Sequence, residues 1–128
     1  MTKKELLETK NKLITLSEKR KSIIEKRNKL LDLKMENEIK YKSIKSEKIL
    51  KTDFKQLFGK DNDNIRESFI QKECKNEIKT IEKIEKELVQ NKNELGQIDV
   101  EISVHRNIFN GLIEVLKTEE DIKKPLEL

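Results

Sequence analysis

Residues 74–116 read CKNEIKTIEKIEKELVQNKNELGQIDVEISVHRNIFNGLIEVL, and this stretch decides the fold. Every seventh residue is apolar: Cys74, Ile81, Leu88, Leu95, Ile102, Phe109 and Leu116. Three residues after the first six of these stand Glu77, Ile84, Asn91, Ile98, His105 and Leu112. Alternating steps of three and four place both series on one helix face, like the a and d positions of a coiled coil. The stretch therefore predicts one long helix that packs against another helix.

A strand is the competing interpretation for part of this stretch. After Gly96, the residues Ile98, Val100, Ile102 and Val104 alternate with polar residues, which is a strand pattern. The seven-residue spacing continues through the segment, and no second convincing strand is available to pair with it. We therefore expect a helix here.

The composition fits long amphipathic helices. Of the 128 residues 42% are charged and 34% hydrophobic, with three glycines and one proline, so few residues would interrupt a helix. A chain of this length forms one domain at most. The regular apolar spacing argues against disorder, which the high charge would otherwise suggest.

The clearest interruption is the segment from Phe58 to Asn64. Gly59 can adopt the left-handed conformation that ends a helix, and Asn64 with Glu67 can cap the next one. We therefore predict an all-α, antiparallel two-helix hairpin as a single domain over residues 1–128. Its first arm covers about residues 3–58, the turn 59–64, the second arm about 65–122 and a short tail 123–128, with Pro125 marking the end of the second arm. The same pattern would also suit a dimer that exchanges arms, or one part of a hetero-oligomeric helical bundle.

The charges of the two arms are complementary. Residues 1–60 hold 18 Lys/Arg against 9 Asp/Glu, a net of +9, and residues 61–128 hold 11 against 16, a net of −5. With the turn near residue 61 or 62, residue i should face approximately residue 123 − i. Asn37 and Asn91 occupy seam positions, where asparagine can fix the register of helices. They do not face each other under this rule, so we expect each to pair with another chain or to face water.

Two apolar clusters are candidate partner-binding surfaces. At the open end both helices have apolar stripes wider than a two-helix seam needs, whereas the residues beside the turn would serve equally to close the hairpin. One lies at the open end of the predicted hairpin, and the other lies beside the turn residue Gly59. Their residues are Leu6, Leu7, Leu13, Ile14, Ile108, Phe109, Leu112, Ile113 and Leu116 at the open end, and Leu57, Phe58 and Phe69 near the turn.

The chain offers little for catalysis or metal binding. With one histidine and one cysteine, an ordinary zinc site is not available, and Cys74 and His105 suit a packed helix. Asp61-Asn62-Asp63-Asn64 resembles the start of a calcium loop, but Arg66 stands at the glycine position and Lys72 at the final glutamate position. We expect no enzymatic activity and no cofactor.

The start of the chain is basic and lacks the apolar core of a signal peptide, and no apolar run is long enough to span a membrane. These features predict a cytoplasmic protein, whose export would need a route without a cleaved signal.

The residues Leu57-Phe58-Gly59, followed by Ile65 and Phe69, carry a family resemblance. They resemble the turn of the WXG-like helical hairpins of type VII secretion, with Leu57 where the family has tryptophan and without the family's Tyr-x-x-x-Asp/Glu tail. The nearest likeness is to the small helical partners of LXG toxins. The resemblance implies a protein that pairs with the helical N-terminal region of a toxin and helps to deliver it.

We therefore expect a helical binding protein that acts as a targeting or chaperone partner of such a toxin, or that forms a homodimer. One alternative is a nucleic-acid-associated or phage-type inhibitor that uses the lysine-rich first arm, although glutamates interrupt its basic clusters and no aromatic residues alternate with them. Another is a purely structural coiled coil, for which the apolar spacing alone is sufficient.

Overall fold

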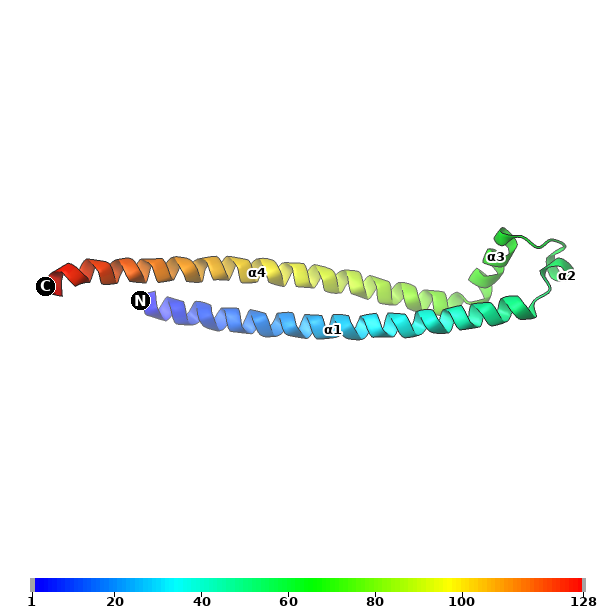
Figure 1. Cartoon of the computed structure of the whole chain (residues 1–128), viewed down its shortest axis with the longest axis horizontal. Helices are drawn as coiled ribbons and strands as arrows, with labels where there is room; N and C mark the ends of the chain where they lie inside the picture. Colours follow the sequence, from blue (N-terminus) through cyan, green and yellow to red (C-terminus); the bar gives the residue numbers. More distant parts are fainter. Residues whose placement is uncertain (1, 128) are drawn as a thin grey trace. The chain divides into compact units, whose positions relative to one another are not determined.

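The computed structural model describes the backbone of residues 2–127 and the side chains of residues 2–120. Four helices follow one another: α1 (Thr2–Lys51), α2 (Phe54–Phe58), α3 (Asp63–Glu73) and α4 (Lys75–Glu127). The long helices α1 and α4 pack antiparallel as a hairpin, and the two short helices belong to the connection between them (Figure 1). The predicted all-α hairpin is confirmed.

The hairpin divides into two compact units. Residues 1–26 and 91–128 form one, here called the terminal unit, and residues 27–90 form the other, here called the connecting unit. Each contains a part of α1 packed against a part of α4, and the connecting unit also contains α2 and α3.

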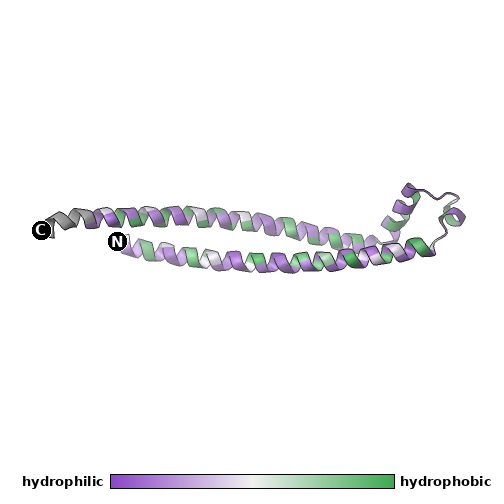
Figure 2. Cartoon of the chain, viewed as in Figure 1, coloured by the Kyte–Doolittle hydropathy of each residue, from purple (hydrophilic) through white to green (hydrophobic). Residues whose placement is uncertain are grey.

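The seven-residue spacing seen in the sequence forms the seam between the helices. On α4 every position of the two series from Cys74 to Leu116 is buried or half-buried. On α1 the same holds for two shorter series, which are Leu16, Ile23, Leu30, Asn37 and Ile44, and Leu13, Arg20, Arg27, Lys34 and Tyr41. Apolar residues recur along both long helices between charged ones (Figure 2). The segment around Val100, which also has a strand pattern, is helical.

In the terminal unit the seam is tightest around Leu16 and Asn91. The Leu16 side chain is fully buried and Asn91 is 2% exposed. The Asn91 side-chain amide donates a hydrogen bond of 3.0 Å to the backbone carbonyl of Ile23 on α1. The expectation that Asn91 pairs with another chain or faces water is therefore wrong, because Asn91 crosses the seam of its own hairpin. Asn37, in the connecting unit, donates to the carbonyl of Leu33 on its own helix.

The first helix ends earlier than the sequence suggested. It ends at Lys51, and Asp53 then caps a separate helix α2 by accepting a hydrogen bond of 3.1 Å from the backbone amide of Gln56. An aspartate with extended backbone is a strong N-cap, so the chain restarts a helix here instead of continuing α1. The second arm is similarly divided at Cys74, between α3 and α4. Helix α4 then continues to Glu127, beyond the predicted end near residue 122, in a segment whose side chains lie outside the described residues.

The turn itself uses Gly59 and Asn62. Gly59 has a backbone φ of 74°, in the left-handed region, and this conformation ends α2. Its backbone amide donates a hydrogen bond to the carbonyl of Lys55. The next helix is capped by Asn62, whose side chain accepts from the amide of Ile65 at 2.9 Å. The predicted cap at Asn64 is wrong, because Asn62 has the extended backbone that a cap needs and Asn64 already lies inside α3.

Two glycines are expected to respond oppositely to alanine. Gly59→Ala should destabilise the protein by about 1–2 kcal/mol, because a side chain disfavours the left-handed conformation. Gly96→Ala should stabilise it by about 1 kcal/mol, because Gly96 lies inside α4 and a Cβ there meets nothing within 4 Å. Thermal unfolding followed by circular dichroism tests both. Equal changes in Tm for the two variants would contradict the left-handed conformation of Gly59.

Ion pairs across each unit set the register of the hairpin. Arg20 Nε lies 2.7 Å from Asp99 in the terminal unit, and Lys48 Nζ lies 3.2 Å from Glu73 in the connecting unit. The rule 123 − i places residues 103 and 75 opposite these cations, so the predicted register holds to about one helical turn at these two pairs. It fails at Asn91, which bonds to Ile23 although the rule places residue 100 there. In both pairs the cation comes from α1 and the carboxylate from the second arm, from α4 for Asp99 and from α3 for Glu73, as the charges of the two arms predict. The pairs are half-exposed, so they select orientation more than they add stability.

Candidate protein-binding surfaces

The terminal unit contains the apolar residues expected to bind a partner at the open end, and it separates them into two groups. Leu7 is 58% exposed, Ile14 47% and Ile108 48%. The others are half-buried, because they contribute to the seam between α1 and α4: Leu6, Leu13, Phe109, Leu112, Ile113 and Leu116. The exposed part of the expected surface is therefore narrower than the full group of nine residues predicted at the open end.

An open groove brings three of these residues together. Leu13 and Ile14 of α1 and Phe109 of α4 line it, along with polar side chains that include Lys10 and Ser17. An apolar floor with a cationic rim can accept an apolar side chain of a partner helix next to a carboxylate.

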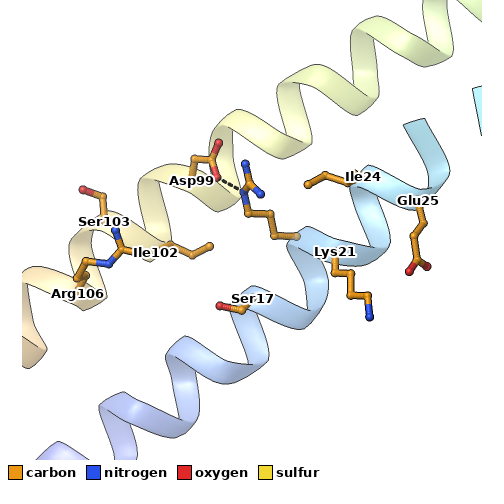
Figure 3. A pocket seen from close by; sticks show the side chains of 9 residues that line it. Ser17, Lys21, Ile24, Glu25, Asp99, Ile102, Ser103 and Arg106 are labelled. Carbon is orange, nitrogen blue, oxygen red and sulfur yellow. Dashed lines mark hydrogen bonds and ion pairs between the residues drawn. The ribbon is translucent and has the colours of Figure 1, made fainter. Parts of the chain in front are cut away.

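A second groove in the same unit is more polar. Arg20 of α1 pairs with Asp99 of α4 at this groove. Figure 3 shows Ile24 and Ile102 between the helices and Arg106 further along α4. Its other lining side chains are Ser17, Lys21, Glu25 and Ser103. Groups of both charges are present, so this groove can form hydrogen bonds and ion pairs at the edge of a contact with another protein.

The connecting unit holds an aromatic cluster beside the turn. The ring of Phe54 is 3% exposed, and its centroid lies 5.1 Å from that of Phe69 in an edge-to-face arrangement. Phe58 packs against both rings but is 50% exposed, and Leu57 is 65% exposed. The cluster thus closes the turn with Phe54 and leaves Leu57 and Phe58 accessible.

Arg66 fixes the position of this cluster. Its guanidinium lies 5.3 Å from the ring centroid of Phe54 and donates two hydrogen bonds, of 2.7 and 2.8 Å, to the carboxylate of Asp61. The bonds to Arg66 lower the pKa of Asp61. The contacts of Arg66 therefore connect the loop before α3 to the aromatic rings. Asp61, which belongs to the segment that resembles a calcium loop, has a structural role instead.

The Cys74 thiol is buried and inaccessible at the junction of α3 and α4. Burial raises the pKa of this thiol, and so does the nearby carboxylate of Glu77. Both effects disfavour the reactive thiolate. The interpretation of Cys74 as a small buried hydrophobic residue is confirmed.

Cys74 is expected to react with a thiol reagent only when the connecting unit opens. Modification by a chromogenic disulfide at pH 8 should be about 100-fold slower in the folded protein than in denaturant. The rate should rise on Phe54→Ala, which removes the buried ring of the aromatic cluster. Rapid modification of the folded wild-type protein would contradict the burial of this residue.

His105 belongs to the seam of the terminal unit. It is half-buried, and its Nδ1 lies 2.8 Å from the backbone carbonyl of Glu101 on the same helix. Across the residues whose side chains the structure describes, no group of three or more His, Cys, Asp and Glu has the geometry to hold a metal ion. The helices in the described part of the chain also include none long and apolar enough to cross a membrane.

Three exposed valines on the part of α4 in the terminal unit were not among the expected site residues. Val100 is 64% exposed, Val104 49% and Val115 48%. The alternation from Ile98 to Val104 is the signal that could have revealed two of them, because residues two apart lie on nearly opposite sides of a helix. When Ile98 and Ile102 face the seam, Val100 and Val104 must face outward.

The fold and these surfaces define the chain as a small all-α protein built on a long helical hairpin with several exposed apolar positions. No known protein family, no curated protein and no solved structure matches it.

Proposed function

We propose that this protein is a non-enzymatic module that binds another helical protein. The observation that carries the proposal is the number of large apolar side chains left exposed on helices whose inner faces are already packed. They are Leu7, Ile14, Val100, Val104, Ile108 and Val115 in the terminal unit, and Leu31, Leu33, Met35, Ile39, Leu50, Leu57, Phe58 and Val89 in the connecting unit. Scattered single apolar residues need no explanation, but rows of them along a helix favour a partner.

The proposed mechanism is docking of a partner helix onto the hairpin. In the terminal unit, Ile14 and Phe109 border an open groove, and Leu7 lies two turns before Ile14 on the same side of α1. A partner helix with apolar residues at spacings of three, four and seven could place them in this groove. Burying one such side chain contributes about 1.5–3 kcal/mol.

As the specific partner we propose the helical N-terminal region of a type VII secreted toxin, for which this protein would act as a targeting or chaperone subunit in the cytoplasm. The supporting feature is the turn Leu57-Phe58-Gly59, which resembles the WXG-like turn. Gly59 has the left-handed conformation, and Leu57 and Phe58 are exposed beside it.

Co-expression with the helical product of a neighbouring gene tests this function. We expect a complex that survives purification and whose affinity, measured by calorimetry, changes little between low and high salt, because apolar burial drives it. Leu7→Asp with Ile14→Asp should weaken binding about 100-fold or more, since it places two charges in the contact.

Circular dichroism of that double variant should match the wild type, because both residues are exposed and outside the seam. The matched control is Asn11→Asp with Ser22→Asp, which adds the same charge at exposed α1 positions that line neither groove and removes no apolar surface. Equal affinity for the apolar and control variants would contradict docking at this groove.

Binding of nucleic acid is the second candidate function. Exposed lysines on α1, such as Lys19, Lys21 and Lys26, favour it. Against it, Arg20, Lys34 and Lys48 already pair with carboxylates of α4 and α3. A duplex of mixed sequence distinguishes the two functions, since contacts to phosphates would lose affinity by orders of magnitude as salt rises.

A further inference from the structure

A second apolar stripe runs along α4 on the side away from α1. Val100, Val104, Ile108 and Val115 follow one another at spacings of four, four and seven residues, and each is about half-exposed or more. Ile98, Ile102, Phe109 and Leu116, which form the seam, are half-buried. Helical periodicity places the first set outside the seam: Val100 faces almost directly away from it, while Val104, Val115 and Ile108 lie progressively nearer its edge. We call Val100, Val104, Ile108 and Val115 the outer stripe.

Gly111 belongs to the same face, eleven residues after Val100. A Cβ built at Gly111 meets nothing within 4 Å, so this position is open to the outside. Absence of a side chain here leaves a notch between Ile108 and Val115. A large apolar side chain of a second helix could approach the α4 backbone closely at this notch.

Carboxylates alone border the outer stripe. Between residues 93 and 119, helical periodicity places four ionisable residues within a quarter turn of it: Glu94, Glu101, Glu114 and Glu119, all exposed. The side chains of the cationic residues Lys92, Arg106 and Lys117 leave the backbone on the other side of the helix. Lys117 reaches Glu114 at 3.6 Å, while Glu94 and Glu101 form no ion pair with a described residue. The outer stripe is therefore an apolar surface between acidic borders.

We propose that the outer stripe is a docking site for an amphipathic helix of another protein whose apolar face is bordered by lysine and arginine. The inference rests on the proposed function and adds the surface and the chemistry of the partner. Apolar contacts along the stripe supply the affinity, and the cations of the partner meet the glutamates on both borders. Charge complementarity of this kind fixes orientation and excludes helices with acidic borders.

The charges also explain why a second copy of this chain is not the occupant. Pairing of two outer stripes would bring only carboxylates together along the contact, which is unfavourable. In the terminal unit the outer face of α1 is more basic, but its exposed large apolar residues are Leu7 and Ile14, and it also carries Glu18 and Glu25. Docking of α4 on α1 of the next copy would also be a head-to-tail contact, which tends to continue without closing.

Two synthetic helical peptides test the proposal against the full-length protein. Each has about 21 residues, roughly six turns, with the same leucine stripe, and the borders are lysine in one and glutamate in the other. Fluorescence anisotropy at moderate salt measures binding of each. We expect the lysine-bordered peptide to bind about tenfold or more tightly than the glutamate-bordered peptide.

Variants assign that preference to the outer stripe. Val104→Asp with Ile108→Asp should reduce binding of the lysine-bordered peptide about tenfold or more, whereas Val89→Asp, a matched exposed valine of α4 outside the stripe, should leave it unchanged. Glu94→Lys with Glu101→Lys should reduce or reverse the preference between the peptides. Because all these positions are exposed, unchanged circular dichroism verifies folding.

Three results would overturn the proposal: equal binding of the two peptides, equal effects of the stripe variant and Val89→Asp, or self-association that the stripe variant abolishes. These results would leave the proposed function standing if the complex with the neighbouring gene product still forms and still depends on Leu7 and Ile14. If the complex with the neighbouring gene product does not form, but the protein still prefers the lysine-bordered peptide, the proposed function is contradicted and the docking site is not.

Discussion

Leu16→Asp is expected to unfold the terminal unit. The Leu16 side chain is fully buried in the seam between α1 and α4, and few other residues of this unit are equally enclosed. Aspartate would lose the apolar burial and would place a charge where no cation is available to compensate, so we expect a loss of about 3 kcal/mol or more. For a protein of this size the loss lowers Tm by about 15 °C.

The matched control is Ile14→Asp, two residues earlier in the same helix. Ile14 is 47% exposed, so the same chemical change should lower Tm by only a few degrees, on the order of 0.5 kcal/mol. Hydrogen exchange then locates the effect of Leu16→Asp. Amides of residues 2–26 and 91–120 should lose protection first. Similar Tm values for the two variants would contradict the position of Leu16 in the seam.

Asn91→Leu is expected to stabilise the protein. The Asn91 side chain is buried and its amide donates to the Ile23 carbonyl, but its Oδ1 is buried without a hydrogen-bond partner. Leucine has the same number and branching of side-chain heavy atoms, with larger methyl groups, and removes the desolvated oxygen. The Ile23 carbonyl keeps its hydrogen bond within α1. We expect a gain of about 1–2 kcal/mol in the free energy of unfolding, read from denaturant titration.

The same substitution should relax the specificity of the seam. A buried asparagine favours one register and one number of helices at a cost in stability, so Asn91→Leu should produce species larger than the wild type in light scattering. Asn93→Leu is the control, because Asn93 is exposed on α4 and should change stability by less than about 0.5 kcal/mol. Destabilisation by Asn91→Leu would mean that water or another group satisfies Oδ1.

The architecture could be predicted because helical packing follows a local rule. A seven-residue apolar spacing requires a helix with one packed face, and the opposite charges of the arms select an antiparallel partner within the chain. The spacing also assigned Ile84 and Leu112 to the seam, and both are buried or half-buried. A single turn glycine at position 59 then fixed the approximate register.

The ends of the helices could not be predicted as well, because caps depend on backbone angles that sequence alone leaves open. Aspartate or asparagine occurs at Asp53, Asp61, Asn62, Asp63 and Asn64, and each residue type can cap a helix. Only Asp53 and Asn62 serve as N-caps. The break after Lys51 was missed for this reason.

The accessible surface was also only partly predictable. Where two apolar residues adjoin, as Leu6 and Leu7 or Ile108 and Phe109 do, the sequence does not decide which one faces the partner helix. In the structure Leu6 and Phe109 are half-buried, while Leu7 and Ile108 are exposed. Of the outer stripe only Ile108 was predicted, because the seven-residue spacing identifies the seam and not the apolar residues on other faces of the helix.

In the proposed function, the hairpin is complete within one chain and uses its exposed apolar positions to bind a different helical protein. Light scattering after size-exclusion chromatography tests it most directly, on the purified protein alone and co-expressed with its genomic neighbours. We predict a stable complex of defined stoichiometry with a neighbouring helical protein, which Leu7→Asp with Ile14→Asp abolishes while the hairpin stays folded. A homodimer that binds none of its neighbours would contradict the claim and would favour a purely structural coiled coil.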